Sequence, residues 1–107
     1  MNISDRTLNA LQGKTFACQQ SDTADLTYVM NWAAVLQTGE IATSTWTTSS
    51  GAIIAAPANT TAAASARLSG APGKHTITNT ITTAAGETDT RDILLTITGD
   101  TVQGDYE

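Results

Sequence analysis

Apolar and polar residues alternate along most of this chain, which is the pattern of β-strands that bury one face. The alternation is clearest in two runs of the second half, residues 75–83 and 89–98. The side chains that this pattern turns inward are Ile77, Asn79, Ile81, Ile93, Leu95 and Ile97. The outward positions of the first run are threonines, which suit an exposed strand face. These two runs predict a hairpin that closes the fold.

Four earlier segments are also predicted to be strands: residues 14–20, 26–32, 41–48 and 62–68. The inward side chains expected in them are Phe16, Cys18, Leu26, Tyr28, Met30, Trp32, Ala64, Ala66 and Leu68. The alanine-rich segment 62–68 has helical propensity, but its period of two favours a strand.

The other segments are expected to lack strands. Residues 1–13 are predicted to be an arm with one or two helical turns, begun by Ser4 as N-cap and ended by Gly13. Residues 33–40 are read as a turn and loop, and residues 49–61 as a loop broken by Pro57.

Six or seven strands at this spacing, joined by Gly, Pro and Asp turns, predict an all-β fold. We expect an immunoglobulin-like antiparallel β-sandwich of about seven strands. The expected organisation is an N-terminal arm over residues 1–13, one sandwich domain over 14–98 and a short C-terminal tail over 99–107.

Composition supports strands and indicates a thin core. Threonine makes up about a fifth of the 107 residues, and much of the 40% apolar content is alanine. In such a core the two tryptophans, Trp32 and Trp46, are the natural anchors, because a large ring buries several times the area of an alanine. We expect them to cover opposite regions of the core. The alternative is an exposed aromatic platform that stacks on a sugar or a base.

Charge excludes two classes of partner. The formal net charge is −5 and the pI is about 4.5. The five basic residues are scattered as Arg6, Lys14, Arg67, Lys74 and Arg91. We therefore expect no nucleic-acid partner and no binding to anionic membranes, both of which need clustered positive charge.

Cellular location is constrained by what the first residues and the cysteine content lack. The N-terminal residues have neither the basic nor the apolar region of a signal peptide, and no apolar run is long enough to span a bilayer. Cys18 is the single cysteine, so an intrachain disulfide is impossible. We expect a soluble protein made in a reducing cytosol.

The residues capable of catalysis are few. His75, the single histidine, is expected to be exposed at a strand end, and no serine motif accompanies it. Two acidic sets, Asp22 with Asp25 and the group Glu87, Asp89 and Asp92, lie in or beside predicted turns. Acidic residues there usually form turns or remain solvated. Asp89, Arg91 and Asp92 also suit an exposed ion pair at a strand edge.

Metal and phosphate sites lack their sequence patterns. Calcium-loop spacing, zinc-binding Cys and His clusters and a P-loop are all missing. Cys18 is expected to be a small buried hydrophobe rather than a reactive thiol. The sequence therefore predicts no catalytic, cofactor-binding or metal-binding residues, no cofactor and no enzymatic activity.

Two stretches resemble a family of tailed-phage virion proteins. The segment LTYVMNWAAVLQTGEIATSTWTT has a strand that ends in Trp, a short loop and an I-x-x-S-x-W-T strand. The segment TITNTITTAAGETDTRDILLTI resembles the family's final hairpin, with its T-N-x-I-T-T-x-x-G-x-T-D-x-R core. The matching residues of this hairpin are Thr78, Asn79, Ile81, Thr82, Thr83, Gly86, Thr88, Asp89 and Arg91.

This resemblance, to small immunoglobulin-like phage proteins such as fibre-tail adaptors and decoration proteins, implies a non-enzymatic virion structural protein. It implies other virion proteins of the tail, fibre or capsid as partners, multiple copies in a symmetric assembly, and assembly in the cytoplasm of a bacterial host. The adaptor between tail and fibre is the favoured role. The alternatives are a capsid decoration (cement) protein and a carbohydrate-binding or adhesive module.

Overall fold

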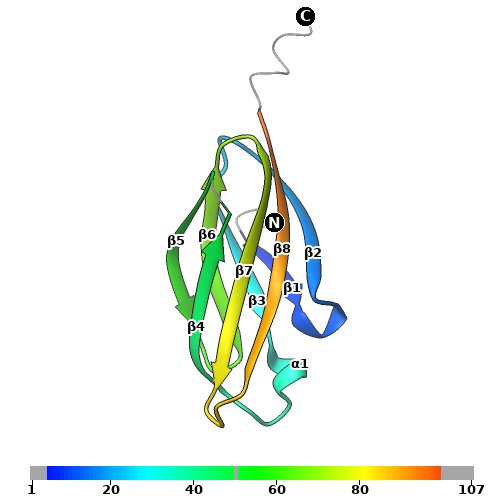
Figure 1. Ribbon diagram of the computed structural model, residues 1–107, viewed down its shortest axis with the longest axis vertical. Helices are drawn as coiled ribbons and strands as arrows, with labels where there is room; N and C mark the ends of the chain where they lie inside the picture. Colours follow the sequence, from blue (N-terminus) through cyan, green and yellow to red (C-terminus); the bar gives the residue numbers. More distant parts are fainter. Residues whose placement is uncertain (1–4, 50, 100–107) are drawn as a thin grey trace, which may run out of the picture.

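The computed structural model describes residues 5–49 and 51–99, which form a β-sandwich of two four-stranded sheets (Figure 1). The strands in these ranges are β1 (Asp5–Asn9), β2 (Thr15–Ser21), β3 (Leu26–Asn31), β4 (Ile41–Thr48), β5 (Ala52–Asn59), β6 (Ala63–Gly70), β7 (Gly73–Thr83) and β8 (Thr88–Thr98). A 3-10 turn, η1 (Ala10–Gln12), and one short helix, α1 (Ala33–Leu36), complete the described elements. The all-β prediction is confirmed, and every strand predicted from alternation is present.

The sheets have the strand orders β1–β3–β6–β5 and β2–β8–β7–β4. The second sheet faces the viewer in Figure 1. Neighbouring strands are antiparallel except at one side of the molecule, where β1 joins β3 and β2 joins β8 in parallel. β1 and β2 follow one another in the chain but lie at the edges of opposite sheets. The turn η1 carries the chain from one sheet to the other. The antiparallel arrangement expected from the sequence therefore fails at these two pairs.

The core lies between the sheets and follows the predicted parity. Its fully buried large side chains are Tyr28, Met30, Trp32, Leu68, Ile77, Asn79, Ile81, Ile93, Leu95 and Ile97. Phe16, Cys18 and Trp46 are half-buried and pack against this cluster. Ala64 and Ala66 are also buried, which confirms the strand reading of the alanine-rich segment.

The prediction of a helical N-terminal arm is wrong for most of the described residues of this segment. Asp5–Asn9 is a strand in register with β3, and only Ala10–Gln12 turns helically. Asn9 supplies the cap, since its side-chain oxygen accepts the Leu11 N–H at 3.0 Å. Ala10 is fully buried in the core, so this segment packs on its own domain. Ser4, the expected N-cap, lies outside the described residues, as does the predicted tail beyond Gly99.

The predicted loop at residues 49–61 contains β5, the edge strand next to β6. Sequence reasoning missed it because Pro57 interrupts the pattern and most of its side chains are exposed. The strand accommodates the proline with a bulge between Ala55 and Ala58, where Ala56 has a φ of 49°. The predicted loop after Trp32 likewise contains α1.

Candidate interaction site at the hairpin end

A buried hydrogen-bond network joins the two sheets around Asn79. The Nε1–H of Trp32, which follows β3, donates to Oδ1 of Asn79 in β7 at 2.9 Å. The Nδ2 of Asn79 donates to Oγ of Ser44 and to the carbonyl of Thr45 in β4, each at 3.0 Å. Trp32 and Asn79 are both fully buried. Because a buried amide is costly unless it is hydrogen-bonded, these partners explain how Asn79 occupies a position among isoleucines.

Arg91 is the second buried polar member of this region. Its guanidinium carbon lies 4.8 Å from the centroid of the Trp32 ring, a cation–π geometry. Its Nε donates to the carbonyl of Ala10 at 2.9 Å, and its Nη1 donates to Oδ1 of Asp89 at 2.9 Å and to the carbonyl of Thr90 at 2.7 Å. The ion pair expected between Arg91 and Asp89 is present, but the expected exposure is wrong for Arg91, which is only 7% exposed. Arg91 alternates in step with the inward residues of β8, and this position in the pattern could have predicted its burial.

Trp46 lies beside Asn79, on the neighbouring strand β4. It is the register partner of Asn79, is half-buried, and contacts the core cluster. A register shift between Ile41 and Thr43 places both Ile41 and Trp46 on the core side of β4. The two tryptophans thus share one neighbour instead of covering opposite regions of the core, as the sequence led us to expect.

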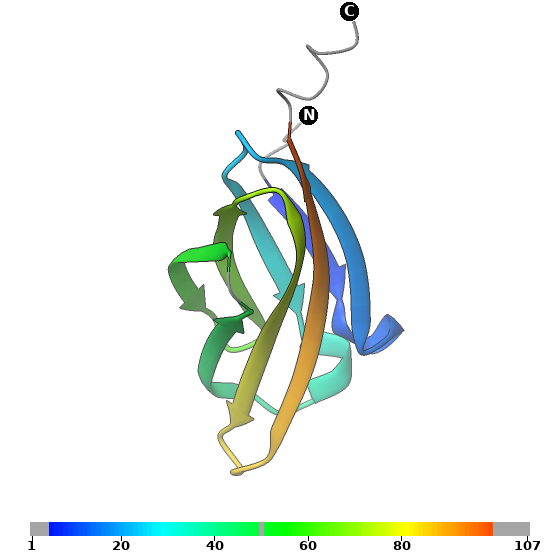
Figure 2. The ribbon, with the colours of Figure 1, turned by 45° about the horizontal axis from the view of Figure 1, so that its top comes forward.

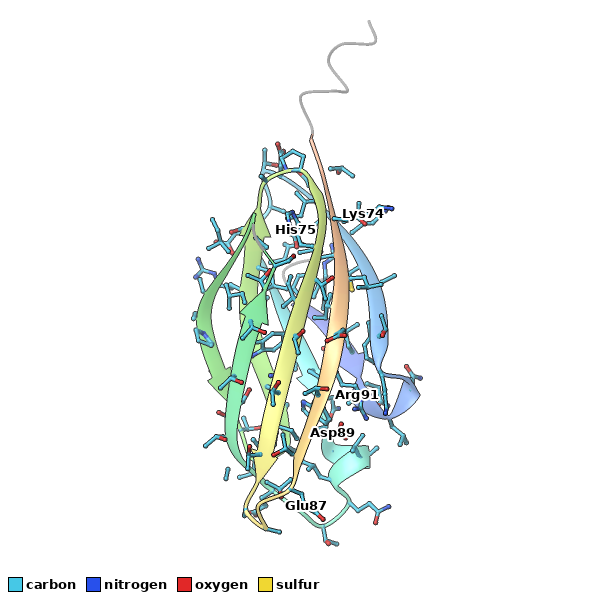
Figure 3. All side chains as sticks on the ribbon, viewed as in Figure 1. Lys74, His75, Glu87, Asp89 and Arg91 are labelled. Atoms are coloured by element: carbon cyan, nitrogen blue, oxygen red, sulfur yellow. The ribbon has the colours of Figure 1, made fainter. Side chains whose placement is uncertain are left out.

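Below this network a groove of about 550 Å³ runs between α1 and the β7–β8 hairpin. We call it the hairpin-end groove. Its apolar lining comes from Val35 and Leu36 of α1 and from Ile81. Its acidic lining residues are Glu40, Glu87 and Asp89. Figure 3 shows Glu87 and Asp89 near the lower end of the molecule, beside Arg91.

The hairpin turn that borders the groove is held by several hydrogen bonds. The Thr83 N–H donates to the carbonyl of Glu87 at 2.7 Å, and the Thr83 hydroxyl accepts the Glu87 N–H at 3.1 Å. Gly86 takes the left-handed φ of 91° that this turn requires. The Ala84 N–H donates to the carbonyl of Glu40 at 2.9 Å, which ties the turn to the loop before β4. The groove is therefore bordered by backbone with fixed geometry.

The groove carries net negative charge. Arg91 is the nearest cation, and its ion pair joins it to Asp89, whose side chain is 45% exposed. Glu40 and Glu87 are both exposed, and their two negative charges add to those of this ion pair. A segment with basic groups at its ends and an apolar centre therefore matches the groove. Sequence reasoning missed this site because its apolar lining comes from a segment read as a loop.

His75 lies at the opposite end of the β7–β8 hairpin from the acidic groups (Figure 3). It is 7% exposed, so the expectation that it is exposed is wrong. One ring nitrogen lies 2.8 Å from the carbonyl of Ala71. The ring also occupies the space beside Gly51, where an added Cβ would come within 2.7 Å of His75 Cε1. This histidine therefore packs and hydrogen-bonds within the fold.

Asp25 and Asp92 each interact with a side chain of another segment. Asp25 forms a two-pronged ion pair with Arg67, with hydrogen bonds of 2.8 and 3.3 Å, and this bond holds the pKa of the Asp25 carboxyl below its usual value. Asp92 accepts the Thr78 hydroxyl at 2.9 Å. Within residues 5–49 and 51–99, no group of three His, Cys, Asp or Glu side chains is placed to hold a metal ion.

Cys18 is half-buried on β2, facing the sandwich interior. Burial raises the pKa of its thiol, and the nearby charge of Arg6 acts in the opposite direction. A thiol with a raised pKa is less reactive at neutral pH. In the described part of the chain, no helix is long and apolar enough to cross a membrane.

Comparison with known proteins places these features in a family. The model of the family described as "Podophage GP4 fiber-tail adaptor protein gp77" matches residues 20–96, which include Trp32, Asn79, Arg91 and the hairpin-end groove. No curated protein sequence matches the chain. The crystal structure of the cysteine protease inhibitor EhICP2 from Entamoeba histolytica has a TM-score of 0.48 and 8% identity, over 85% of this chain and 94% of that one, which is too distant to carry an argument. Because the family model covers most of the sequence, this chain belongs to the podophage GP4 fiber-tail adaptor family.

Proposed function

We propose that this protein is a non-enzymatic structural component of a phage virion that bridges tail and fibre through protein–protein contacts. The family match over residues 20–96 is the observation that carries this proposal. The chemistry of the described residues agrees with it, because Asn79, Arg91, His75 and Asp25 all interact within the fold. In this role the protein is assembled into the particle inside the bacterial host and is present in several copies.

The hairpin-end groove is the first contact surface in this proposal. Its occupant is a segment of another virion protein that carries lysine or arginine around an apolar side chain. The exposed carboxylates of Glu40 and Glu87 attract the basic groups, while Val35 and Leu36 receive the apolar one. The net charge of −5 acts in the same direction and speeds the encounter with a basic partner.

The two alternative roles differ in what they require. A carbohydrate-binding module needs exposed aromatic rings, but the large exposed hydrophobic residues of the described part are Leu11, Ile53 and Leu94. A capsid decoration protein needs contacts repeated over the capsid surface, and it is separated from an adaptor by copy number. The family match favours the adaptor.

Reconstitution tests the bridging role. Tails purified from particles that lack this protein are mixed with purified fibres, with and without the added protein. We expect fibres to attach only when the protein is added, as counted by electron microscopy. Fibre attachment without it, or no binding of the protein to either component, would contradict the proposal.

Charge variants test the groove within the same assay. Glu40→Gln with Glu87→Gln removes two negative charges from the groove, whereas Thr47→Lys with Thr90→Lys adds two positive charges on exposed positions of β4 and β8. Both doubles change the net charge by the same amount. We expect the first to weaken attachment by roughly tenfold and the second to leave it unchanged. Equal effects would show that only the overall charge matters.

A further inference from the structure

We infer that β2 is a docking edge at which an extended segment of a second virion protein adds as a further strand. This inference rests on the proposed bridging function and gives the adaptor a second contact, away from the hairpin-end groove. In Figures 1 and 2, β2 lies at the outer margin of its sheet, with its free side turned away from β8. An unpaired row of backbone groups of this kind is a template for another strand.

Within residues 5–49 and 51–99, the other three sheet edges are protected, and β2 is not. On the far side of the sandwich, β4 and β5 contact each other, and β5 is interrupted by Pro57 and its bulge. On the near side, β1 is five residues long and carries Arg6. In contrast, β2 pairs with β8 in unbroken register over seven residues and contains no proline and no charged residue. These are the features that natural edges usually avoid.

The backbone groups available on β2 follow from its pairing with β8. The Asp92 N–H donates to the carbonyl of Lys14, and the Asp22 N–H donates to the carbonyl of Thr98. In a strand, the N–H and C=O of alternate residues point to opposite edges. The even-numbered residues of β2 therefore bond to β8, and the N–H and C=O groups of Thr15, Ala17 and Gln19 point to the open side. Their side chains are exposed as well.

The surface beside this edge indicates what the added strand carries. A second groove of about 790 Å³ lies along it, lined by Arg6, Leu8, Cys18 and four neighbours. The Nε of Arg6 is buried there and, among the described residues, has no hydrogen-bond acceptor. The guanidinium carbon lies 5.7 Å from the centroid of the Tyr28 ring, and this ring contact does not supply an acceptor for the Nε–H. The occupant is therefore an extended segment with small or β-branched side chains and one carboxylate that reaches Arg6.

A second copy of this chain is a poorer occupant. If two β2 edges paired about a twofold axis near Cys18, the two Arg6 guanidinium groups would approach each other, since Arg6 is close enough to influence the pKa of Cys18. Two chains that each carry a net charge of −5 would also be brought together. A strand of another protein that brings a carboxylate to Arg6 avoids the repulsion between these two guanidinium groups.

The test compares Gln19→Pro with Gln19→Ala in the full chain. Both variants remove the same side chain, but only proline removes the N–H that points to the open edge. Binding is measured separately to tails and to fibres purified from particles that lack this protein. We expect Gln19→Pro to weaken binding to one of them by roughly tenfold and Gln19→Ala to match the wild type. Equal binding by both variants would overturn the inference.

Amide hydrogen exchange on the wild-type complex provides a readout that does not depend on variant folding. We expect binding to slow exchange at Thr15, Ala17 and Gln19, while Phe16 and Cys18 are already slow in the free protein. Unchanged exchange at the odd-numbered amides would overturn the inference. If these amides are slow in the free protein and become fast when residues 100–107 are deleted, the edge is occupied by the chain's own C-terminus, and the inference is wrong.

Three outcomes distinguish a failure of this inference from a failure of the proposed function. A concentration-dependent dimer that Gln19→Pro abolishes, seen by sedimentation, would replace the partner strand by a second copy. Failure of the wild-type protein to bind both tails and fibres would count against the proposed function itself. Wild-type binding that both Gln19 variants retain counts against the β2 edge alone.

Discussion

At the scale of single residues, Asn79 links the two tryptophans of this core, which has few aromatic rings. It hydrogen-bonds the ring of Trp32, pairs in register with Trp46 and holds two groups of β4. Arg91 covers the Trp32 ring and reaches the carbonyl of Ala10. Asn79 and Arg91, two of the residues by which the chain resembles its family, therefore help to fasten the two sheets together.

Parity along the strands predicted much of this arrangement. The inward positions of β7 and β8 follow from alternation alone, Asn79 included. The same alternation turns His75 and Arg91 inward, but their charge and polarity favoured an exposed reading. The burial of Arg91 depends on distant segments that supply Trp32 and Ala10, and the burial of His75 depends on the nearby Ala71 carbonyl and on the distant Gly51. Such partners cannot be identified before the register is known.

Asn79→Ala tests the network. The change leaves the Nε1–H of Trp32 buried without its acceptor, so we expect the free energy of unfolding to fall by about 1–3 kcal/mol. Chemical denaturation followed by tryptophan fluorescence measures it. Thr90→Ala, on the exposed face of β8, is the control and is expected to change stability by less than about 0.5 kcal/mol. An Asn79→Ala protein as stable as the control would show that the hydrogen bond contributes nothing.

Tyr28 predicts an alkaline limit to stability. Burial raises the pKa of its hydroxyl from 10.0 to about 12, and the neutral hydroxyl donates to Oε1 of Gln20 at 2.7 Å. Because the folded pKa is the higher one, this contribution is fully present below pH 10 and is lost as the pH rises towards 12. We expect unfolding free energy to decline across this window in the wild type and less in Tyr28→Phe. Identical pH profiles would assign the decline to other groups.

At the scale of elements, the long alternating strands were predictable and the edges were not. β7 and β8 bury one complete face, so their pattern is strong. β1 has five residues and β5 is mostly exposed, so neither shows a clean period of two. Both exist because they pair with an inner strand, β3 or β6. Tertiary pairing thus decided the structure where local sequence was ambiguous.

Deleting residues 1–13 tests whether the predicted arm is part of the domain. The truncation removes β1, the buried Ala10 and the acceptor of the Arg91 Nε. We expect a loss of about 2 kcal/mol or more in unfolding free energy, since Arg91 then has a buried donor without a partner. Deleting residues 1–4 keeps β1 and is the control. A 1–13 truncation as stable as this control would restore the boundary predicted at residue 13.

At the scale of the whole molecule, the two proposed contact surfaces are separate. The hairpin-end groove is acidic and lies at one end, between α1 and the β7–β8 turn. The β2 edge follows one side of the sandwich; β2 itself carries no charged residue, and Arg6 lines the groove beside it. An adaptor needs two such surfaces, because a single surface can bind either tail or fibre but cannot join them. In the proposed function, the acidic groove binds a basic segment and the β2 edge binds an extended one.

The copy number of this chain in purified particles tests the central claim most directly. Quantitative mass spectrometry against the major capsid protein measures it. A tail-to-fibre adaptor is limited by the symmetry of the tail, so we expect a small number of copies that matches this symmetry. Hundreds of copies, in proportion to the capsid protein, would contradict the adaptor and indicate a decoration protein, and absence from the particle would contradict any role as a virion component.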